Sequence, residues 1–139
     1  MAKKIITDIT IRFRDIDSMG HVNNAVFFTY FEEGRKEFLQ TLFNIVNPDE
    51  YNFILAHVEC DYLKPVRISD PISLQLWVGE TGQKKFDLEY RIVNRDDQSI
   101  VYASGRSVQI FYDYKNNLTI PIPRYFLDRI AEYTEKQTP

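Results

Sequence analysis

The sequence has one cysteine, and no stretch of it approaches the ~18 consecutive apolar residues that a membrane-spanning helix needs. Cys60 alone cannot form a disulfide within the chain, which fits a reducing compartment. The lysines near the start are not followed by the apolar core of a secretory signal peptide. We therefore expect a soluble cytoplasmic protein that does not enter a membrane.

Glycine and proline are also scarce, with 5 Gly and 6 Pro against 10 Phe and 9 Tyr. Together with 44% hydrophobic residues, this composition excludes a disordered or low-complexity chain. The formal charge of −3 gives no bulk attraction to nucleic acid, so we expect no nucleic-acid partner. The length of 139 residues suits one domain, expected over residues 1–139.

The first two predicted elements differ in the spacing of their apolar residues. Apolar and polar residues alternate over 5–14, including Phe13 on the apolar face, which predicts a half-buried strand. From 25 to about 44 the spacing becomes three or four, which predicts a long buried helix capped by Asn23 or Asn24. Gly34 costs this helix about 1 kcal/mol relative to Ala, so we expect another backbone to pass close to it.

Four strand-like segments follow, and a short amphipathic helix is predicted after 120. Short links between consecutive segments predict antiparallel pairing. The fourth segment, 100–112, is apolar on both faces, as a central strand is. The first segment is predicted to place five side chains on one face, namely Ile54, Ala56, Val58, Cys60 and Tyr62.

These elements predict an α+β fold in which a long central helix packs on one face of a five- to six-stranded antiparallel sheet, with a short C-terminal helix. One helix of this length does not cover such a sheet completely. We therefore expect self-association.

Polar residues crowd the segment DIDSMGHVNN directly before the predicted helix. Each has a structural explanation in turn formation, positive φ or helix capping, and histidine is more often structural than catalytic. The residues concerned are Asp15, Asp17, Gly20, His21, Asn23 and Asn24.

The same segment also suits acyl transfer. Unpaired amides at a helix start polarise a carbonyl, and Asp17 lies across a bend from them, so its carboxylate can attack the carbonyl or activate water. A metal site at Asp15, Asp17 and His21 lacks a second cluster of ligands at metal spacing, and we expect none. Ser18 lacks the nucleophile elbow of a serine hydrolase.

Four segments carry a family resemblance over nearly the whole chain, to about Pro123. They are FRDIDSMGHVNNAVFFTYFEEGRKEF, VECDYLKPVRISDPISLQLWV, GQKKFDLEYRIVN and ASGRSVQIFYD. They resemble the hotdog-fold acyl-CoA thioesterases of the 4-hydroxybenzoyl-CoA thioesterase group. The resemblance implies a hotdog fold, dimers that pair their sheets and often form tetramers, and a substrate groove shared between protomers.

The resemblance also implies roles for individual residues. Asp17 matches the family's catalytic carboxylate, as general base or nucleophile, and the N–H of Asn24 matches the amide that polarises the carbonyl. Gly20 matches the loop glycine. His21 has a supporting role, because Met19 stands where plant acyl-carrier-protein thioesterases have an Asn. We further assign Asn23 to the substrate loop and Tyr62 to the substrate lining.

The anionic nucleotide of coenzyme A requires local positive charge in an acidic protein. No cofactor is expected beyond coenzyme A as part of the substrate. The candidate cations are Lys64, Arg67, Lys84, Lys85 and Arg91.

Three alternatives to an acyl-CoA thioesterase stay open. The same fold serves non-catalytic binding proteins, acyl-carrier-protein thioesterases and dehydratases, although the central helix has no histidine to serve a dehydratase. The acyl group itself is also open between aromatic, short-chain and long-chain.

Overall fold

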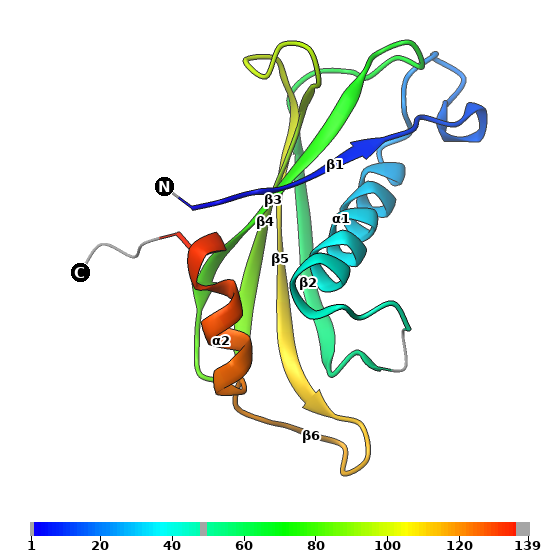
Figure 1. Ribbon diagram of the computed structural model, residues 1–139. Coiled ribbons are helices and arrows are strands. Elements are labelled where there is room, and N and C mark those ends of the chain that lie inside the picture. The colour runs from blue at the N-terminus through cyan, green and yellow to red at the C-terminus, as the bar shows by residue number, and fades with distance from the viewer. Residues whose placement is uncertain (1, 48–49, 136–139) are drawn as a thin grey trace.

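The computed structural model describes residues 2–47 and 50–135, and it confirms the predicted α+β fold: a long helix lies across one face of an antiparallel sheet (Figure 1). The elements are β1 (Ile5–Ile9), a 3₁₀ turn (Phe13–Asp15), α1 (Val26–Phe43), β2 (Phe53–Tyr62), β3 (Ile72–Thr81), β4 (Lys85–Asn94), β5 (Val101–Asp113), β6 (Leu118–Thr119), α2 (Arg124–Ile130) and a final 3₁₀ turn (Ala131–Tyr133).

The sheet has the strand order β1-β3-β4-β5-β2, and the short β6 pairs with the end of β5. All these pairs are antiparallel, as predicted. β3, β4 and β5 are joined by hairpins, so consecutive strands pair here. The prediction fails for β2 and β3, because the link 63–71 carries the chain across the sheet and leaves β2 paired with β5 at the edge.

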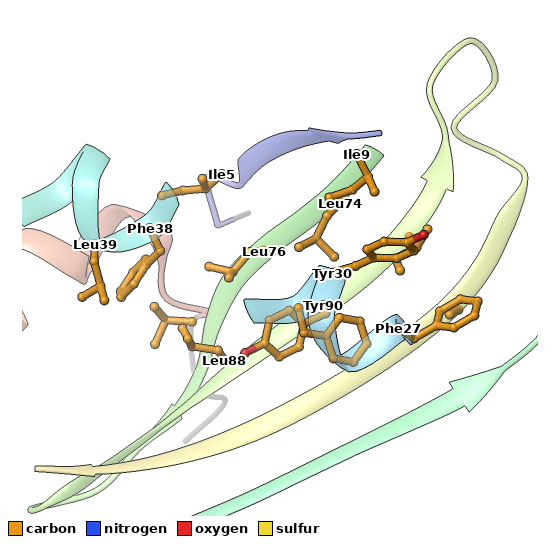
Figure 2. Packing of buried hydrophobic residues seen from close by; sticks show 14 of the residues in the cluster. Ile5, Ile9, Phe27, Tyr30, Phe38, Leu39, Leu74, Leu76, Leu88 and Tyr90 are labelled. Carbon is orange, nitrogen blue, oxygen red and sulfur yellow. The ribbon is translucent and has the colours of Figure 1, made fainter. Parts of the chain in front are cut away.

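The core lies between α1 and the face of the sheet that α1 covers (Figure 2). The predicted alternation in β3 and β4 is confirmed by side chains that are fully or almost fully buried, and burying each of these contributes roughly 1.5–3 kcal/mol. They are Ile72, Leu74, Leu76, Val78, Phe86, Leu88, Tyr90 and Ile92. We predicted that another backbone passes close to Gly34, but its nearest neighbour is the Leu74 side chain, whose Cδ2 would clash with an added Cβ.

The first strand is shorter than predicted and ends at Ile9. The chain then turns, because the amide of Asp15 donates to the carbonyl of Arg12 and the Asp15 carboxylate accepts from the amide of Arg12. Phe13 lies in this turn and is 87% exposed, so its predicted place on the buried face is wrong.

A bulge in β2 changes which side chains face α1. Leu55 lies opposite Gln109, whereas His57 lies opposite Val108, so β2 carries one extra residue between them. Because side chains alternate along a strand, the extra residue swaps the faces. The prediction that Ile54 shares a face with Tyr62 is therefore wrong: Tyr62 lies on the face of α1, and Ile54 lies on the other, while Ala56 is the extra residue itself.

α1 packs more closely on β1 and β3 than on β2. Two side chains on the helix-facing side of β2 are correspondingly open, with Leu55 46% and Tyr62 42% exposed. Two cavities lie along this side of the helix. Within the described residues, no helix is long and apolar enough to span a membrane.

Candidate active site

The loop before α1 is fastened to the helix through Asp15. Its buried carboxylate accepts hydrogen bonds from the Arg12 amide and from the hydroxyl of Tyr30 on α1, both at 2.9 Å. Burial, followed by the bond to Asp15, raises the pKa of Tyr30, so the hydroxyl stays protonated and donates. Asp15 thus has a structural role.

The same loop is fastened to the link between β2 and β3. The amide of Val22 donates to the carbonyl of Val66 at 2.8 Å, and His21 and Arg67 form an isolated β-bridge. The amide of Asn23 donates to the carbonyl of Asp15 at 2.8 Å. These bonds hold the polar loop beside a segment more than forty residues later in the chain.

Asp17 closes a tight turn and keeps one carboxylate oxygen free. Its Oδ1 accepts from the amides of Met19 at 2.9 Å and His21 at 3.2 Å, while the carbonyl of Asp17 accepts from the amide of Gly20. Gly20 has φ of 81°, the positive value predicted for it. Within the described part of the chain, Oδ2 has no hydrogen-bond partner. The turn therefore anchors the carboxylate and leaves one oxygen available.

α1 begins at Val26, and its cap position is Ala25, not Asn23 or Asn24 as predicted. Asn23 nevertheless serves the preceding turn: its Oδ1 accepts from the amide of Ala25 at 2.9 Å, and its carbonyl accepts from the amide of Val26 at 2.9 Å. The Asn23 carbonyl points toward the helix, and the Asn24 N–H belongs to the same peptide group. Because the C=O and N–H of a trans peptide point in opposite directions, the Asn24 N–H points away from the helix. This amide has no partner in residues 2–47 and 50–135.

Tyr62 reaches the helix start from the end of β2. Its hydroxyl donates to the main-chain carbonyl of Asn24 at 2.7 Å, and its ring meets that of Phe27 edge-on at 5.1 Å. Partial burial raises the pKa of Tyr62. Its neutral hydroxyl can therefore hold the peptide group after Asn24.

These residues border an open cavity of about 260 Å³. Five of the predicted site residues meet there: Asp17, His21, Asn24, Tyr62 and Lys64. Gly20 and Asn23 do not line the cavity and act through the turn and the helix start. The other lining residues are Val22, Phe27, Leu63, Pro65 and Val66. Of these, the residue types alone suggested only Phe27, as part of an aromatic lining. The local sequence of the link 63–71 does not predict that it lines the cavity, because its position depends on the hydrogen bonds to the polar loop.

The predicted coenzyme A cations lie at three places in the structure, and one pair is near the cavity. Lys64 is exposed at the cavity, and Arg67 lies beside His21 through the main-chain bridge. Neither side chain has an ion-pair partner within the described residues. Lys64 is accordingly free to contact an anion that enters the cavity, whereas Arg67 is not among the lining residues.

Lys84 and Lys85 lie at the turn between β3 and β4, about 30 Å from the opposite end of these ten-residue strands. Lys84 Nζ donates to Thr119 at 3.0 Å, and Lys85 Nζ pairs with Asp87 at 3.0 Å and Glu80 at 3.7 Å. Within one chain, these lysines do not reach the cavity beside Asp17.

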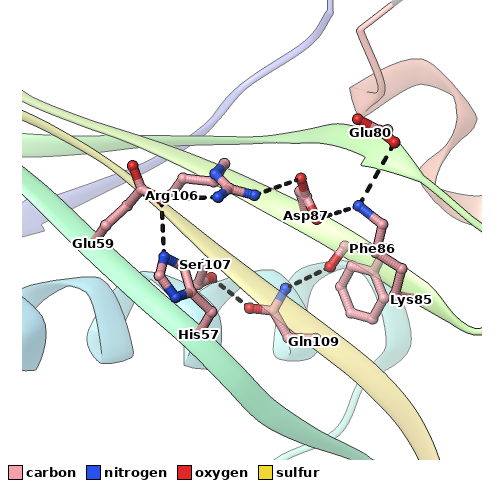
Figure 3. A network of polar contacts seen from close by, with 9 residues as sticks. All are labelled: His57, Glu59, Glu80, Lys85, Phe86, Asp87, Arg106, Ser107 and Gln109. Atoms are coloured by element: carbon pink, nitrogen blue, oxygen red, sulfur yellow. Dashed lines mark hydrogen bonds and ion pairs between the residues drawn. The ribbon is translucent and has the colours of Figure 1, made fainter.

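The outer face of the sheet carries a separate charged network (Figure 3). Arg106 bonds to Glu59 at 2.8 Å and to Asp87 at 3.1 Å, and His57 contacts Glu59 at 2.9 Å. Hydrogen bonds from His57 and then Arg106 lower the pKa of Glu59. This face points away from α1, and Arg91 lies on it over the ring of Trp77 at 5.6 Å. Among the described residues, no group of three or more His, Cys, Asp or Glu is placed to hold a metal.

Residues 11–130 match the model of the thioesterase-like superfamily. The chain belongs to this superfamily. Membership confirms the expected enzyme class, a thioester hydrolase.

Individual relatives agree with this family. The 1,4-dihydroxy-2-naphthoyl-CoA hydrolase of Acaryochloris marina is 29% identical, over 90% of this chain and 94% of that protein. A Thermus thermophilus thioesterase, solved in complex with coenzyme A and Zn, is 29% identical with a TM-score of 0.77, covering 90% of this chain and 95% of that chain.

A structure described as a predicted thioesterase from Bacillus stearothermophilus has a TM-score of 0.87 at 21% identity, covering 98% of this chain and all of that chain. At that identity, the similarity concerns the fold alone. It supports the hotdog fold that the sequence resemblance implied.

Proposed function

We propose that the chain hydrolyses acyl-CoA thioesters to a free acid and coenzyme A in the cavity between the Asp17 turn and the start of α1. The proposal rests on one observation. Asp17 Oδ2 and the Asn24 N–H have no hydrogen-bond partner in the described residues, and Asp17 and Asn24 line the same cavity. A thioester carbonyl needs such a pair, a base or nucleophile on carbon and a donor on oxygen.

In the general-base form, Asp17 Oδ2 takes a proton from water while the water oxygen bonds to the thioester carbon. The carbonyl oxygen becomes an oxyanion that accepts a hydrogen bond from the Asn24 N–H. The carbon–sulfur bond then breaks, the coenzyme A thiolate leaves and takes up the proton, and the free acid remains. In the nucleophilic form, Asp17 Oδ2 attacks the carbon itself, the carbon–sulfur bond breaks, and the coenzyme A thiolate leaves. Water then hydrolyses the resulting anhydride to the free acid and the Asp17 carboxylate, and the proton released goes to the thiolate.

Two features of the helix start favour this chemistry. α1 has 18 residues and no acidic side chain in its first turn, so nothing there neutralises its partial positive charge. The main-chain groups of His21 and the hydroxyl of Tyr62 hold Asp17 and the Asn24 carbonyl in place. Preorganised groups of this kind stabilise developing charge without reorganising during the reaction.

In this proposal Lys64, which lines the cavity, and Arg67, which lies beside His21, contact the phosphates of coenzyme A. Lys84 and Lys85 would join them only from a second copy of the chain. β2 has one edge unpaired within the described residues, which supports a dimer in which the two sheets pair. Further assembly to a tetramer rests on the family resemblance alone. The groove would then lie between protomers.

The acyl group contacts the rings of Phe27 and Tyr62, which suit an aromatic or an alkyl chain. The naphthoyl-CoA relative favours an aromatic group, and a 4-hydroxybenzoyl group belongs to the same chemical class. A carrier-protein thioester would present the same carbonyl.

The proposal is tested by measuring the hydrolysis of benzoyl-, acetyl-, octanoyl- and palmitoyl-CoA through the release of free thiol. Asp17→Asn should lower kcat by about 10²- to 10⁴-fold on the best substrate, the usual contribution of a general base. Asp113→Asn is the matched control, because Asp113 also accepts two main-chain amides in a turn but lies outside the cavity.

Near wild-type hydrolysis by the Asp17 variant would remove this carboxylate from the mechanism. Tight binding of an acyl-CoA without turnover of any substrate would instead indicate a non-catalytic binding protein. Turnover of carrier-protein thioesters alone would reassign the substrate.

A further inference from the structure

A second cavity, of about 420 Å³, lies between α1 and β2. Its walls combine an apolar surface with three charged residues, and the rings of Tyr51 and Phe53 stack at 6.0 Å. The lining residues are Glu32, Arg35, Lys36, Leu39, Tyr51 and Phe53, with Leu55.

Arg35 is the unusual member of this wall. Its side chain is half-buried, and its one hydrogen bond within the described residues goes from Nη1 to the hydroxyl of Tyr90 at 3.1 Å. No carboxylate of residues 2–47 or 50–135 pairs with it. A guanidinium has five N–H donors, and withdrawing its charge from water is costly unless an anion accompanies it.

A buried chain of hydrogen bonds fixes this guanidinium. Tyr90 contacts the Ser107 hydroxyl. Ser107 donates to the side chain of Gln109, and Gln109 donates to the carbonyl of Phe86 at 3.1 Å (Figure 3). Since the single hydroxyl hydrogen of Ser107 goes to Gln109, Tyr90 must donate to Ser107 and accept from Arg35. Every bond thus points the same way, and Arg35 is the donor at the head of the chain.

Charge and shape together specify a ligand. Arg35 and Lys36 outweigh the exposed Glu32, so the cavity has an excess of one positive charge on a mainly apolar wall. We propose that this cavity binds a carboxylate attached to an apolar body, with Arg35 as the residue that pairs with the carboxylate. The planar guanidinium matches two carboxylate oxygens, and the apolar body lies on Leu39, Phe53 and their neighbours.

Such a carboxylate has two sources. One is the far end of an acyl group whose thioester lies beside Asp17: Asn24 and Arg35 are about 16 Å apart along the helix axis. Val58 and Cys60, half-buried on the side of β2 that faces α1, lie between the two cavities. The other source is a free carboxylic acid from solution. The first source rests on the proposed function, and the second does not.

Calorimetric titration of the full chain with octanoate and with 1-octanol tests the site directly. Wild-type protein should bind octanoate about tenfold more tightly than the alcohol, because only the acid forms the charge-assisted bonds. Arg35→Gln should abolish this preference. Arg129→Gln should keep it, because Arg129 also donates to one acceptor but lies on α2, outside both cavities.

A second variant covers the case in which Arg35→Gln does not fold. Leu55→Trp places a large ring in the cavity from an exposed strand position, leaves Arg35 intact, and should abolish octanoate binding. Equal binding of acid and alcohol by wild-type protein would overturn the proposal. A second outcome would also overturn it: wild-type protein does not bind octanoate, and Arg35→Gln converts the dimer to a monomer. Arg35 would then pair with a second copy of the chain.

Hydrolysis separates the two sources. If the carboxylate belongs to the substrate, Arg35→Gln should lower kcat/KM for the mono-thioester of octanedioic acid about tenfold more than for octanoyl-CoA. If it is a free acid, both substrates should respond alike while octanoate still binds to wild-type protein. Asp17→Asn should bind octanoate normally, so failure of this site and failure of the proposed catalysis give different results.

Discussion

The hydroxyl of Tyr62 donates a 2.7 Å hydrogen bond to the main-chain carbonyl of Asn24, 38 residues earlier in the chain. This bond joins the edge strand of the sheet to the start of the central helix. The carbonyl it holds belongs to the residue whose amide we propose as the oxyanion donor. The geometry of the donor therefore depends on a side chain from another element.

Tyr62→Phe should lower kcat several-fold and leave KM nearly unchanged. The ring contact with Phe27 survives, so the loss concerns only the hydroxyl and costs about 0.5–1.5 kcal/mol. Steady-state hydrolysis and thermal unfolding measure the two effects. A rise in KM with unchanged kcat would show that the hydroxyl acts on substrate binding instead.

The bond between Asp15 and Tyr30 should be a coupled, stabilising pair. Asp15→Ala leaves the Tyr30 hydroxyl and the Arg12 amide without their acceptor and should cost about 2–4 kcal/mol. In urea unfolding of a double-mutant cycle with Tyr30→Phe, the coupling energy should exceed 0.5 kcal/mol, roughly the lower limit for groups in contact. Additive costs would show that the two groups do not act together.

Gly105→Ala should destabilise the fold by about 1–3 kcal/mol, because an added Cβ overpacks the core. It would lie 2.5 Å from the Phe31 ring and 2.7 Å from the Glu59 carbonyl, and Phe31 cannot yield easily since it stacks on Tyr90 at 4.3 Å. Chemical denaturation measures the loss. Gly82→Ala is the control, where the nearest atom belongs to the flexible Lys85 side chain and little change is expected.

Glu89 should make stability fall as the pH rises. Burial, then repulsion by Glu135, raises its pKa from 4.5 to about 7, although Arg106 opposes the shift. The folded state thus holds a proton that the unfolded state loses near pH 4.5, and the stability this proton provides is lost as the pH rises through 7.

At pH 8, Glu89→Gln should therefore be more stable than wild type by about 1 kcal/mol, a reduced value because solvent screens a half-buried carboxylate. Urea unfolding at pH 4.5, 6 and 8 gives the comparison. Glu80→Gln, on an exposed carboxylate of β3, should show no such divergence. A constant difference between Glu89→Gln and wild type at all three pH values would contradict the assignment.

The elements of this fold follow from local patterns wherever one face is fully buried. Every second residue of β3 and β4 is apolar and buried against α1 over 72–78 and 86–92, as the sequence pattern predicts. The spacing of Tyr30, Phe31 and Phe38 places the long helix to within a residue or two. The β2 bulge and the turn at Phe13 were missed, because each depends on hydrogen bonds rather than on the hydrophobic pattern.

The candidate site divides in the same way. The turn of Asp17 and the positive φ of Gly20 are local, so the residue types alone indicate them. The wall formed by Leu63, Pro65 and Val66, and the lone guanidinium of Arg35, depend on contacts between distant segments. No sequence pattern marks those contacts.

Because of the extra residue in β2, the number of residues between the bulge and Tyr62 decides which side chains face α1. Beyond the bulge, the outward polar side chains of His57 and Glu59 and the inward Val58, Cys60 and Tyr62 occupy alternate positions. An insertion or deletion of a single codon between the bulge and Tyr62 would exchange the two sets, carrying acids into the helix-facing layer and turning Tyr62 outward. Homologous chains should therefore vary freely in the connecting turns while preserving the residue count of this one segment.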